Sequence, residues 1–146
     1  MIGLLQRVRN ARVEVAGKVV ATIDAGLLVF IGVQRGDDEA AAQRLLERLL
    51  AYRVFADADG KMNLSLREIG GGLLLVPQFT LAANTDKGLR ASFAAAAAPE
   101  EGRRLFGHLL DIAQKQHPNV ASGIFGADMQ VTLTNDGPVT FWLESK

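Results

Sequence analysis

Residues 70–81 constrain the fold more than any other stretch of the chain. Three consecutive glycines precede the aliphatic run Leu73–Val76, which contains no alternating polar position. A short run that is apolar throughout predicts a strand buried on both faces, as in the centre of a covered sheet. The run ends in polar or backbone-altering residues, namely Pro77, Gln78 and Thr80, with Phe79 among them. A rigid strand that turns polar at its carboxyl end is a common place for a site, although a core strand running out into a loop has the same pattern.

The composition excludes several classes of protein. The 146 residues are enough for one domain, and the absence of cysteine removes thiol nucleophiles, disulfides and thiolate metal sites. The formal net charge of zero argues against a protein that coats nucleic acid, but leaves open one that grips the end of an RNA. No apolar run approaches the roughly 20 residues of a membrane span, and the N-terminus lacks the basic start of a signal peptide. We therefore expect a single domain over residues 1–146, cytoplasmic and not associated with a membrane.

The order of hydrophobic patterns predicts a mixed α/β domain. The expected strands are residues 4–8, 11–15, 19–23, 26–33, 73–76, 124–133 with a break at Gly126, and 139–143. A tight turn is expected at 16–17 and a hairpin turn at 59–60. One amphipathic helix begins near Asp37 or Asp38 and carries an apolar stripe through Val54, and a second spans residues 99–115. Strands, helix, strands, helix and strands in that order predict mixed sheets with a helical layer.

The common catalytic signatures are missing from the sequence. It has no Gly-x-Ser-x-Gly, His-Glu-x-x-His, P-loop or dinucleotide fingerprint, and neither histidine is near the polar strand end. The Asp-rich residues 57–61 do not fit a calcium loop, because Met62 stands where a glycine is required. A hydrolase built on this chain would lack the usual activated nucleophile and base. Either the chain is a binding module, or the substrate supplies part of the chemistry.

The step Gly137-Pro138 is the second unusual element, and it follows the turn signal Asn135-Asp136. A peptide bond before proline reaches the cis form at modest cost, and a preceding glycine minimises steric constraint. Such a step holds backbone carbonyls in fixed directions with no proline N–H beside them. On its own, the pattern more often marks an ordinary turn that opens a last strand.

Together, these two stretches resemble the paired signatures of the bacterial D-aminoacyl-tRNA deacylases. The signatures are Val-Pro-Gln-Phe-Thr-Leu-Ala-Ala at residues 76–83 and Asn-Asp-Gly-Pro-Val-Thr-Phe at residues 135–141. The resemblance covers essentially the whole chain, because it also includes residues 5–8, 52–55, 60–64 and 125–131. Several separate motifs in the right order make the match specific.

Two positions depart from the family pattern. The strand motif of the family usually reads Ser-Gln-Phe-Thr, and here Pro77 replaces the serine; the family's Arg-Pro-Ser-Phe is Arg-Ala-Ser-Phe at residues 90–93. Pro77 has neither a hydroxyl nor a backbone N–H, so it loses any hydrogen bond that the serine makes. One such bond is typically worth about 0.5–1.5 kcal/mol, and its loss is expected to weaken a site without abolishing it.

The resemblance implies a homodimer with β/β/α layers and two main helices. It implies hydrolysis of the ester that links a D-amino acid, or glycine, to the terminal adenosine of tRNA, a chiral proofreading step that spares L-aminoacyl-tRNA. The catalytic residues implied are Gln78, Phe79 and Thr80, with Gly137 and Pro138 entering from the partner subunit as a chiral filter. The substrate-binding positions implied are Arg7, Pro77, Phe125, Met129, Val139 and Thr140.

The resemblance implies no metal and no cofactor. An aminoacyl ester is already activated, and the adjacent 2′-hydroxyl of the ribose assists its hydrolysis, so the protein supplies mainly positioning and backbone N–H donors. Two other functions stay open from the residues. One is a non-catalytic RNA- or metabolite-binding dimer of the same fold, disabled by Pro77. The other is a small-molecule enzyme, such as an isomerase, at a subunit interface.

Overall fold

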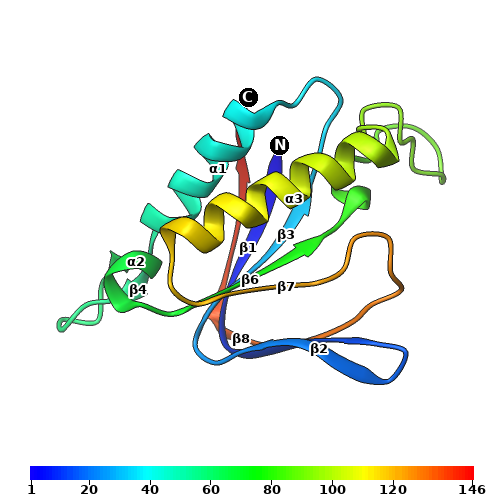
Figure 1. The fold of residues 1–146 in the computed structure, drawn as a ribbon. Coiled ribbons are helices and arrows are strands. Elements are labelled where there is room, and N and C mark those ends of the chain that lie inside the picture. The colour runs from blue at the N-terminus through cyan, green and yellow to red at the C-terminus, as the bar shows by residue number, and fades with distance from the viewer.

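A six-stranded mixed sheet, a two-stranded sheet and two long helices build the fold (Figure 1). The computed structural model describes residues 1–146. The strands are β1 (Ile2–Val15), β2 (Lys18–Ile23), β3 (Gly26–Gly32), β4 (Arg53–Ala56), β5 (Met62–Ser65), β6 (Gly72–Pro77), β7 (Val120–Ser122) and β8 (Gln130–Glu144). The helices are α1 (Glu39–Ala51), α2 (Leu66–Ile69) and α3 (Pro99–Gln116), with a 3₁₀ turn η1 at Phe79–Ala82. The two predicted main helices are α1 and α3.

The strand β6 is central, as its sequence predicts. It lies between β3 and β7, parallel to both, and each of its six residues is buried. On the far side of β3, β1 pairs antiparallel with β2, β3 and β8. Because β1 is 14 residues long, its first half pairs with β3 and its second half with β2. Through this long strand the sheet curls, and β2 crosses near β6 and β7 (Figure 1).

Two apolar clusters fill the two sides of the curled sheet. The larger lies between the sheet and the helices α1 and α3, which both cross one face in Figure 1. The smaller joins β1 and β2 to β3 and β6 inside the curl, through residues such as Val13, Ile23 and Leu74. Two layers of strand and one layer of helix result, which confirms the predicted β/β/α arrangement.

The start of α1 is as predicted, whereas the prediction for its end is wrong. The carboxylate of Asp38 accepts the backbone N–H of Ala41 at 2.8 Å and so caps the helix. The helix ends at Ala51, because Tyr52 adopts an extended backbone with ψ of 132°. Val54 then lies in β4 and is buried there, so it belongs to the two-stranded sheet and not to the helical stripe.

Near the C-terminus, two further predictions are corrected. The predicted break at Gly126 is found, with a φ of +79°, but residues 124–129 form no strand: β7 ends at Ser122 and β8 begins only at Gln130. Residues 135–137 do not form the expected turn, since β8 runs through them while its register against β1 shifts on both sides of Val8. The side chain of Asn135 bridges this irregular ladder, donating to Arg7 O at 2.9 Å and to Val139 O at 3.1 Å.

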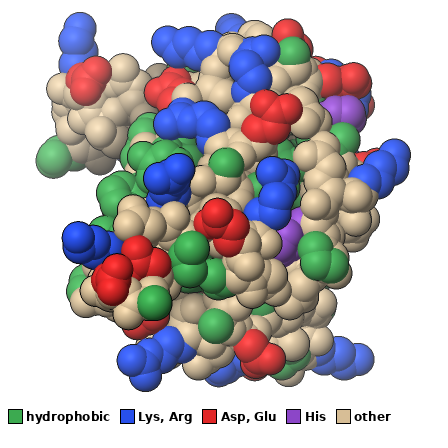
Figure 2. Space-filling view, turned by 90° about the vertical axis from the view of Figure 1, so that its left-hand side faces the viewer, with side chains coloured by type: hydrophobic (Ala, Val, Ile, Leu, Met, Phe, Trp, Pro, Cys, Tyr) green, Lys and Arg blue, Asp and Glu red, His purple; other side chains and the backbone are tan.

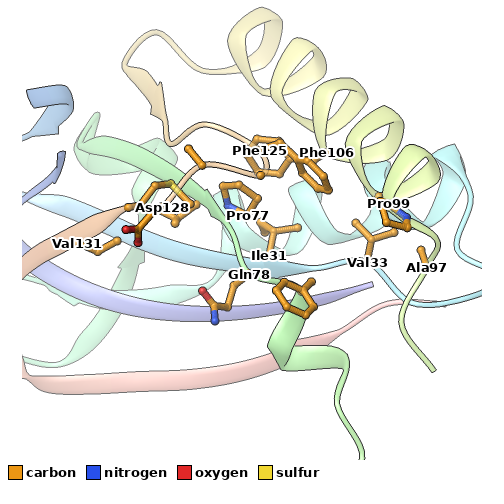
Figure 3. A pocket seen from close by; sticks show the side chains of 16 residues that line it. Ile31, Val33, Pro77, Gln78, Ala97, Pro99, Phe106, Phe125, Asp128 and Val131 are labelled. Carbon is orange, nitrogen blue, oxygen red and sulfur yellow. The ribbon is translucent and has the colours of Figure 1, made fainter. Parts of the chain in front are cut away.

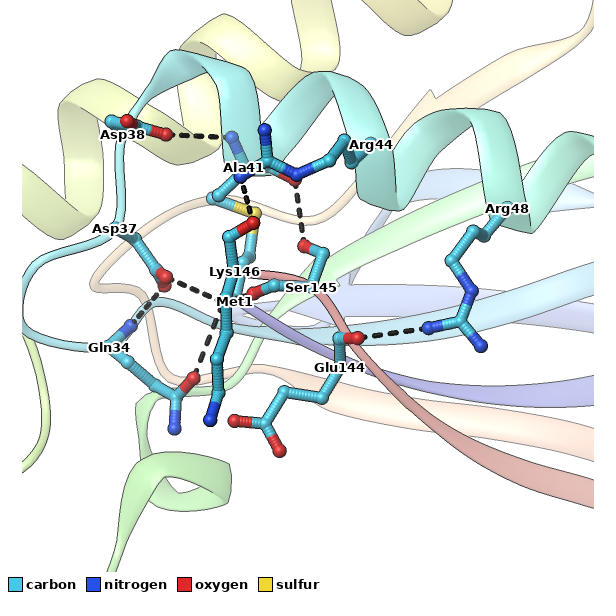
Figure 4. Close-up of polar contacts among 10 residues, drawn as sticks. All are labelled: Met1, Gln34, Asp37, Asp38, Ala41, Arg44, Arg48, Glu144, Ser145 and Lys146. Carbon is cyan, nitrogen blue, oxygen red and sulfur yellow. Dashed lines mark hydrogen bonds and ion pairs between the residues drawn. The ribbon is translucent and has the colours of Figure 1, made fainter.

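The first and last residues of the chain are fixed side by side (Figure 4). The buried α-ammonium group of Met1 donates to Asp37 Oδ1 and to the carbonyl of Ser145, each at 2.6 Å. The guanidinium of Arg48 on α1 donates to Glu144 O at 2.9 Å. Because a buried charge needs such partners, these contacts fix the open ends of β1 and β8 against α1 and its preceding loop.

The surface carries mixed charge on the face drawn in Figure 2. Lys and Arg side chains alternate there with Asp and Glu, and no patch of a single sign dominates. None of the helices combines the length and the apolar character that crossing a membrane requires.

Candidate active site

The carboxyl end of β6 opens into a cavity of about 440 Å³ (Figure 3). The cavity lies between the ends of β3 and β6, the first turns of α3 and the segment that leads into β8. Its lining residues are Ile31, Val33, Val76, Pro77, Gln78, Phe79, Ala97, Pro99, Gly102, Phe106, Phe125, Gly126, Ala127, Asp128, Met129 and Val131. Most are apolar, and the side-chain amide of Gln78 and the carboxylate of Asp128 are the polar groups, which is the usual make-up of a small-molecule site.

Pro77 fits the end of β6 without the loss of a ladder bond. The pairing with β7 covers only Leu73–Leu75, so the ladder on that side has ended before the proline. On the other side, Gln78 N donates to Ile31 O at 2.8 Å and continues the contact with β3. The Pro77 ring faces Gly123, where a Cβ would lie 3.4 Å from Pro77 Cδ. The proline ring thus makes an ordinary packing contact with the backbone of the neighbouring segment.

Gln78, Phe79 and Thr80 form the turn at the cavity mouth. Gln78 Nε2 donates to Thr80 Oγ1, and the exposed ring of Phe79 packs on Phe93 with ring centroids 5.2 Å apart. Within the turn, the N–H of Leu81 donates to Gln78 O and the N–H of Ala83 donates to Thr80 O, each at 3.2 Å. The N–H groups of Phe79 and Thr80 lie at the start of the 3₁₀ turn, where no carbonyl of the turn is placed to accept them. They are therefore free to bind a ligand.

Thr80 is not arranged as a nucleophile. The hydrogen-bond partner of its hydroxyl is the amide of Gln78, and an amide cannot take up a proton as a general base. No group of three or more His, Asp or Glu side chains is placed to hold a metal ion. The chemistry that this turn offers is positioning and backbone N–H donation.

Glycines let the aromatic and thioether groups of the cavity wall pack closely. A Cβ on Gly102 would lie 3.2 Å from the ring of Phe125, which in turn packs against Phe106 with centroids 6.4 Å apart. A Cβ on Gly123 would lie 2.7 Å from the sulfur of Met129. In Figure 3, Phe125 and Phe106 lie together beneath α3. The resulting slot is apolar and flanked by aromatic rings, as suits a planar ligand.

A second cluster surrounds Gly137-Pro138, whose peptide bond is cis. Arg7 donates from Nε to Asp136 O at 3.1 Å and from Nη1 to Val54 O at 2.7 Å. Its guanidinium also lies 3.5 Å from Asp136 Oδ2. Gly137 has a φ of +123°, and a Cβ there would lie 2.8 Å from Arg7 Nη2. Arg7 thus fixes the backbone just ahead of Pro138. Position 137 requires glycine, because both its φ and its closeness to Arg7 disfavour a side chain.

Comparison with known proteins identifies the family. The family model described as D-Tyr-tRNA(Tyr) deacylase matches residues 4–144. The chain belongs to the D-aminoacyl-tRNA deacylase family. It is 66% identical over 146 residues to the D-aminoacyl-tRNA deacylase of Alkalilimnicola ehrlichii, covering all of this chain and 97% of that one. It is 65% identical to the enzyme of the same name from Stutzerimonas stutzeri, covering 99% of this chain and all of that one.

Two solved structures have the same fold. The c-Myc DNA Unwinding Element Binding Protein superposes with a TM-score of 0.96 at 34% identity, covering 100% of this chain and 99% of that chain. A probable eukaryotic D-amino acid tRNA deacylase superposes with a TM-score of 0.78 over 98% of both chains. At 21% identity, the second match supports the fold alone. The family assignment made from the two signatures is thus confirmed.

The residues implied by the deacylase resemblance fall into two groups in this chain. Those that line the cavity are Pro77, Gln78, Phe79, Phe125 and Met129, and Thr80 stands at its mouth. Those of the second cluster are Arg7, Gly137, Pro138, Val139 and Thr140, and none of them lines the cavity of its own chain. Sequence reasoning missed Gly102, Phe106 and Asp128 as lining residues, because the first two lie in the predicted second helix and the third in the strand predicted over 124–133.

Proposed function

We propose that this chain hydrolyses the ester bond of D-aminoacyl-tRNA, and of glycine carried on tRNA, releasing free amino acid and tRNA. The observation that carries the proposal is the cavity at the end of β6, which joins an apolar slot to the turn of Gln78, Phe79 and Thr80 in a member of the deacylase family. The reaction is a proofreading step of translation in the cytoplasm. It needs no metal and no cofactor.

The cavity has a place for each part of the substrate end. The adenine ring enters the slot beside Phe125 and Met129, and the ester lies at the mouth against the turn. Water adds to the ester carbonyl, and the N–H groups of Phe79 and Thr80 stabilise the developing oxyanion. The bond to the ribose oxygen then breaks, and that oxygen takes a proton. The neighbouring ribose hydroxyl assists the attack, which explains why no side-chain nucleophile accompanies the site.

Gly137 and Pro138 act as a chiral filter in the site of a second subunit. Their absence from the lining of their own chain's cavity supports a homodimer in which each chain completes its partner's site. A filter made of main-chain atoms rejects the L-configuration by collision and is indifferent to the amino-acid side chain. Val139 and Thr140 support it, since Thr140 Oγ1 donates to Asn135 Oδ1 at 3.3 Å and Val139 O accepts from the same side chain.

Incubation with D- and L-aminoacyl-tRNA tests the proposal, with both binding and ester loss measured. Selective loss of the D-ester is expected. Binding of either tRNA without ester loss would instead favour a non-catalytic RNA-binding module. Absence of both activities would favour an enzyme acting on a small molecule.

Mixed dimers test the arrangement of the filter. One chain carries Gly137→Ala, and the other carries Phe79→Ala together with Thr80→Ala. If the filter acts across the dimer, one site of the mixed dimer contains both defects and the other contains none, so about half of the selective activity returns. If filter and pocket belong to the same chain, each site keeps one defect and no selective activity returns.

A further inference from the structure

Arg103 on α3 lies against the outer side of the cavity wall. Its Cζ is 5.0 Å from the centroid of the Phe125 ring, in a cation–π contact. Its Nη2 is 3.4 Å from the position that a Cβ on Gly126 would take. Phe125 and Gly126 both line the cavity, so the guanidinium is held against two residues of the cavity wall.

Arg103 has no acidic partner, in contrast to its neighbour on the same helix. Arg104 contacts Glu39 at 2.9 Å and Glu101 at 2.6 Å, and its hydrogen bonds lower the pKa of Glu101. None of the ion pairs of the structure contains Arg103, and its side chain is exposed. Two adjacent arginines thus differ sharply: Arg104 ties α3 to α1, whereas Arg103 keeps its N–H donors free beside the cavity.

We propose that Arg103 binds the phosphate that joins the terminal adenosine to the preceding nucleotide. This inference rests on the proposed function and deepens it, because it makes the last dinucleotide of the tRNA the unit that is recognised. The aromatic contact restricts the position of the guanidinium, whose planar set of N–H donors can bind two oxygens of one phosphate. A single contact of this kind is also consistent with a chain of zero net charge, which cannot rely on a broad basic field.

Two minimal substrates isolate the phosphate. One is adenosine carrying a D-amino acid, which has no phosphate; the other is the dinucleotide cytidylyl-adenosine carrying the same amino acid. Because a charge-assisted hydrogen bond is lost with the phosphate, we expect wild-type kcat/KM to be at least about tenfold higher for the dinucleotide. Arg103→Met should bring this ratio close to one. Arg104→Met is the matched control and should keep the wild-type ratio.

A substrate without the phosphate charge tests the contact with Arg103 without a change to the protein. A dinucleotide with a methylphosphonate in place of the phosphate should react with the wild-type enzyme like aminoacyl-adenosine. For binding of whole tRNA, Arg103→Met should reduce the slope of log affinity against log salt by about 0.7, the value for one phosphate on a single strand.

The failure of this inference differs from the failure of the proposed function. If Arg103→Met lowers kcat/KM equally for both minimal substrates, Arg103 only supports Phe125 and the phosphate contact is wrong. The same holds if the neutral linkage is cleaved as fast as the charged one. If the wild-type protein cleaves neither minimal substrate nor D-aminoacyl-tRNA, the proposed function itself is wrong, and the inference falls with it.

Discussion

Substitution of Arg7 by methionine should lower both the stability of the fold and the preference for the D-ester. Arg7 is the side chain that joins β4 to the residue ahead of Gly137, through its bonds to Val54 O at 2.7 Å and Asp136 O at 3.1 Å. Its side chain is only 16% exposed, so water replaces these bonds poorly. Methionine keeps much of the buried aliphatic stem but removes every donor.

The contacts set the size of the expected effect. A hydrogen bond from a charged group contributes about 1.5–3 kcal/mol, and two are lost here, so the free energy of unfolding should fall by at least about 3 kcal/mol. The ion pair with Asp136 adds little, because that carboxylate is 36% exposed. Release of Asp136 also frees the backbone at Gly137. Since a misplacement of about 1 Å can change a rate about 10²-fold, the ratio of D- to L-ester hydrolysis should fall at least about tenfold.

Arg9→Met is the matched control for this prediction. Arg9 contacts the same carboxylate at 3.5 Å from the solvent side, but its side chain is 74% exposed. A surface pair of this kind contributes about 0–1 kcal/mol, so both stability and selectivity should stay near wild type. Urea unfolding and parallel deacylation of D- and L-aminoacyl-tRNA measure the two quantities. If Arg7→Met folds and spares the L-ester as well as wild type does, Arg7 does not hold the filter.

Three further substitutions test the site. Pro77→Ser should leave deacylation level or raise it modestly, because it restores the family's usual residue; a collapse of activity in a folded variant would show that the pocket has been rebuilt around proline. Thr80→Ala should lower kcat by about 10²-fold or less, the lower end for loss of an acid–base group, and mass spectrometry of quenched reactions should reveal no acyl-enzyme on Thr80. Gly137→Ala should lose stereoselectivity, since its Cβ would meet Arg7 Nη2 at 2.8 Å with φ at +123°; unchanged sparing of L-aminoacyl-tRNA would place the filter elsewhere.

The sequence predicts those parts of the fold whose signals are local. The apolar runs of β3 and β6, the turn at residues 16–17 and the cap at Asp38 each depend on neighbouring residues, and each is found in the structure. Val54 continues the helical spacing of α1, yet pairing of β4 with β5 places it in a strand. Long-range pairing overrides local periodicity at this position.

The hydrogen bonds of polar side chains to partners far away in the chain cannot be predicted from the sequence. Asn135 belongs to a turn signal, but its amide replaces ladder bonds between β8 and β1. His117 follows α3 in a turn-like sequence and is nevertheless only 3% exposed, with Nε2 at 2.6 Å from Gly71 O. Arg7, which accepts from Asn135, and Gly71, which contacts His117, both lie far away in the chain, so the neighbouring residues do not reveal these contacts.

The sequence predicts the site residues that come directly after β6 in the chain. It does not predict those that reach the cavity only through packing between distant elements. Gln78 and Phe79 reach the cavity because β6 ends beside them. Phe106 has the spacing of a helix-core residue, and only the approach of Phe125 across Gly102 makes it part of a slot. Spacing along a helix identifies the buried face, but not the empty space beside it.

The pairing of the first strand with the last has a consequence for biosynthesis. One edge of β1 is closed only by β8, which the ribosome makes long after β1. At about 5–20 residues per second, the edge of β1 waits on the order of ten seconds for its partner. During that interval a long row of unpaired N–H and C=O groups is available to other chains. The backbone that holds Arg7 and Gly137 together therefore forms only after β8 has been made, and so does the chiral filter proposed there.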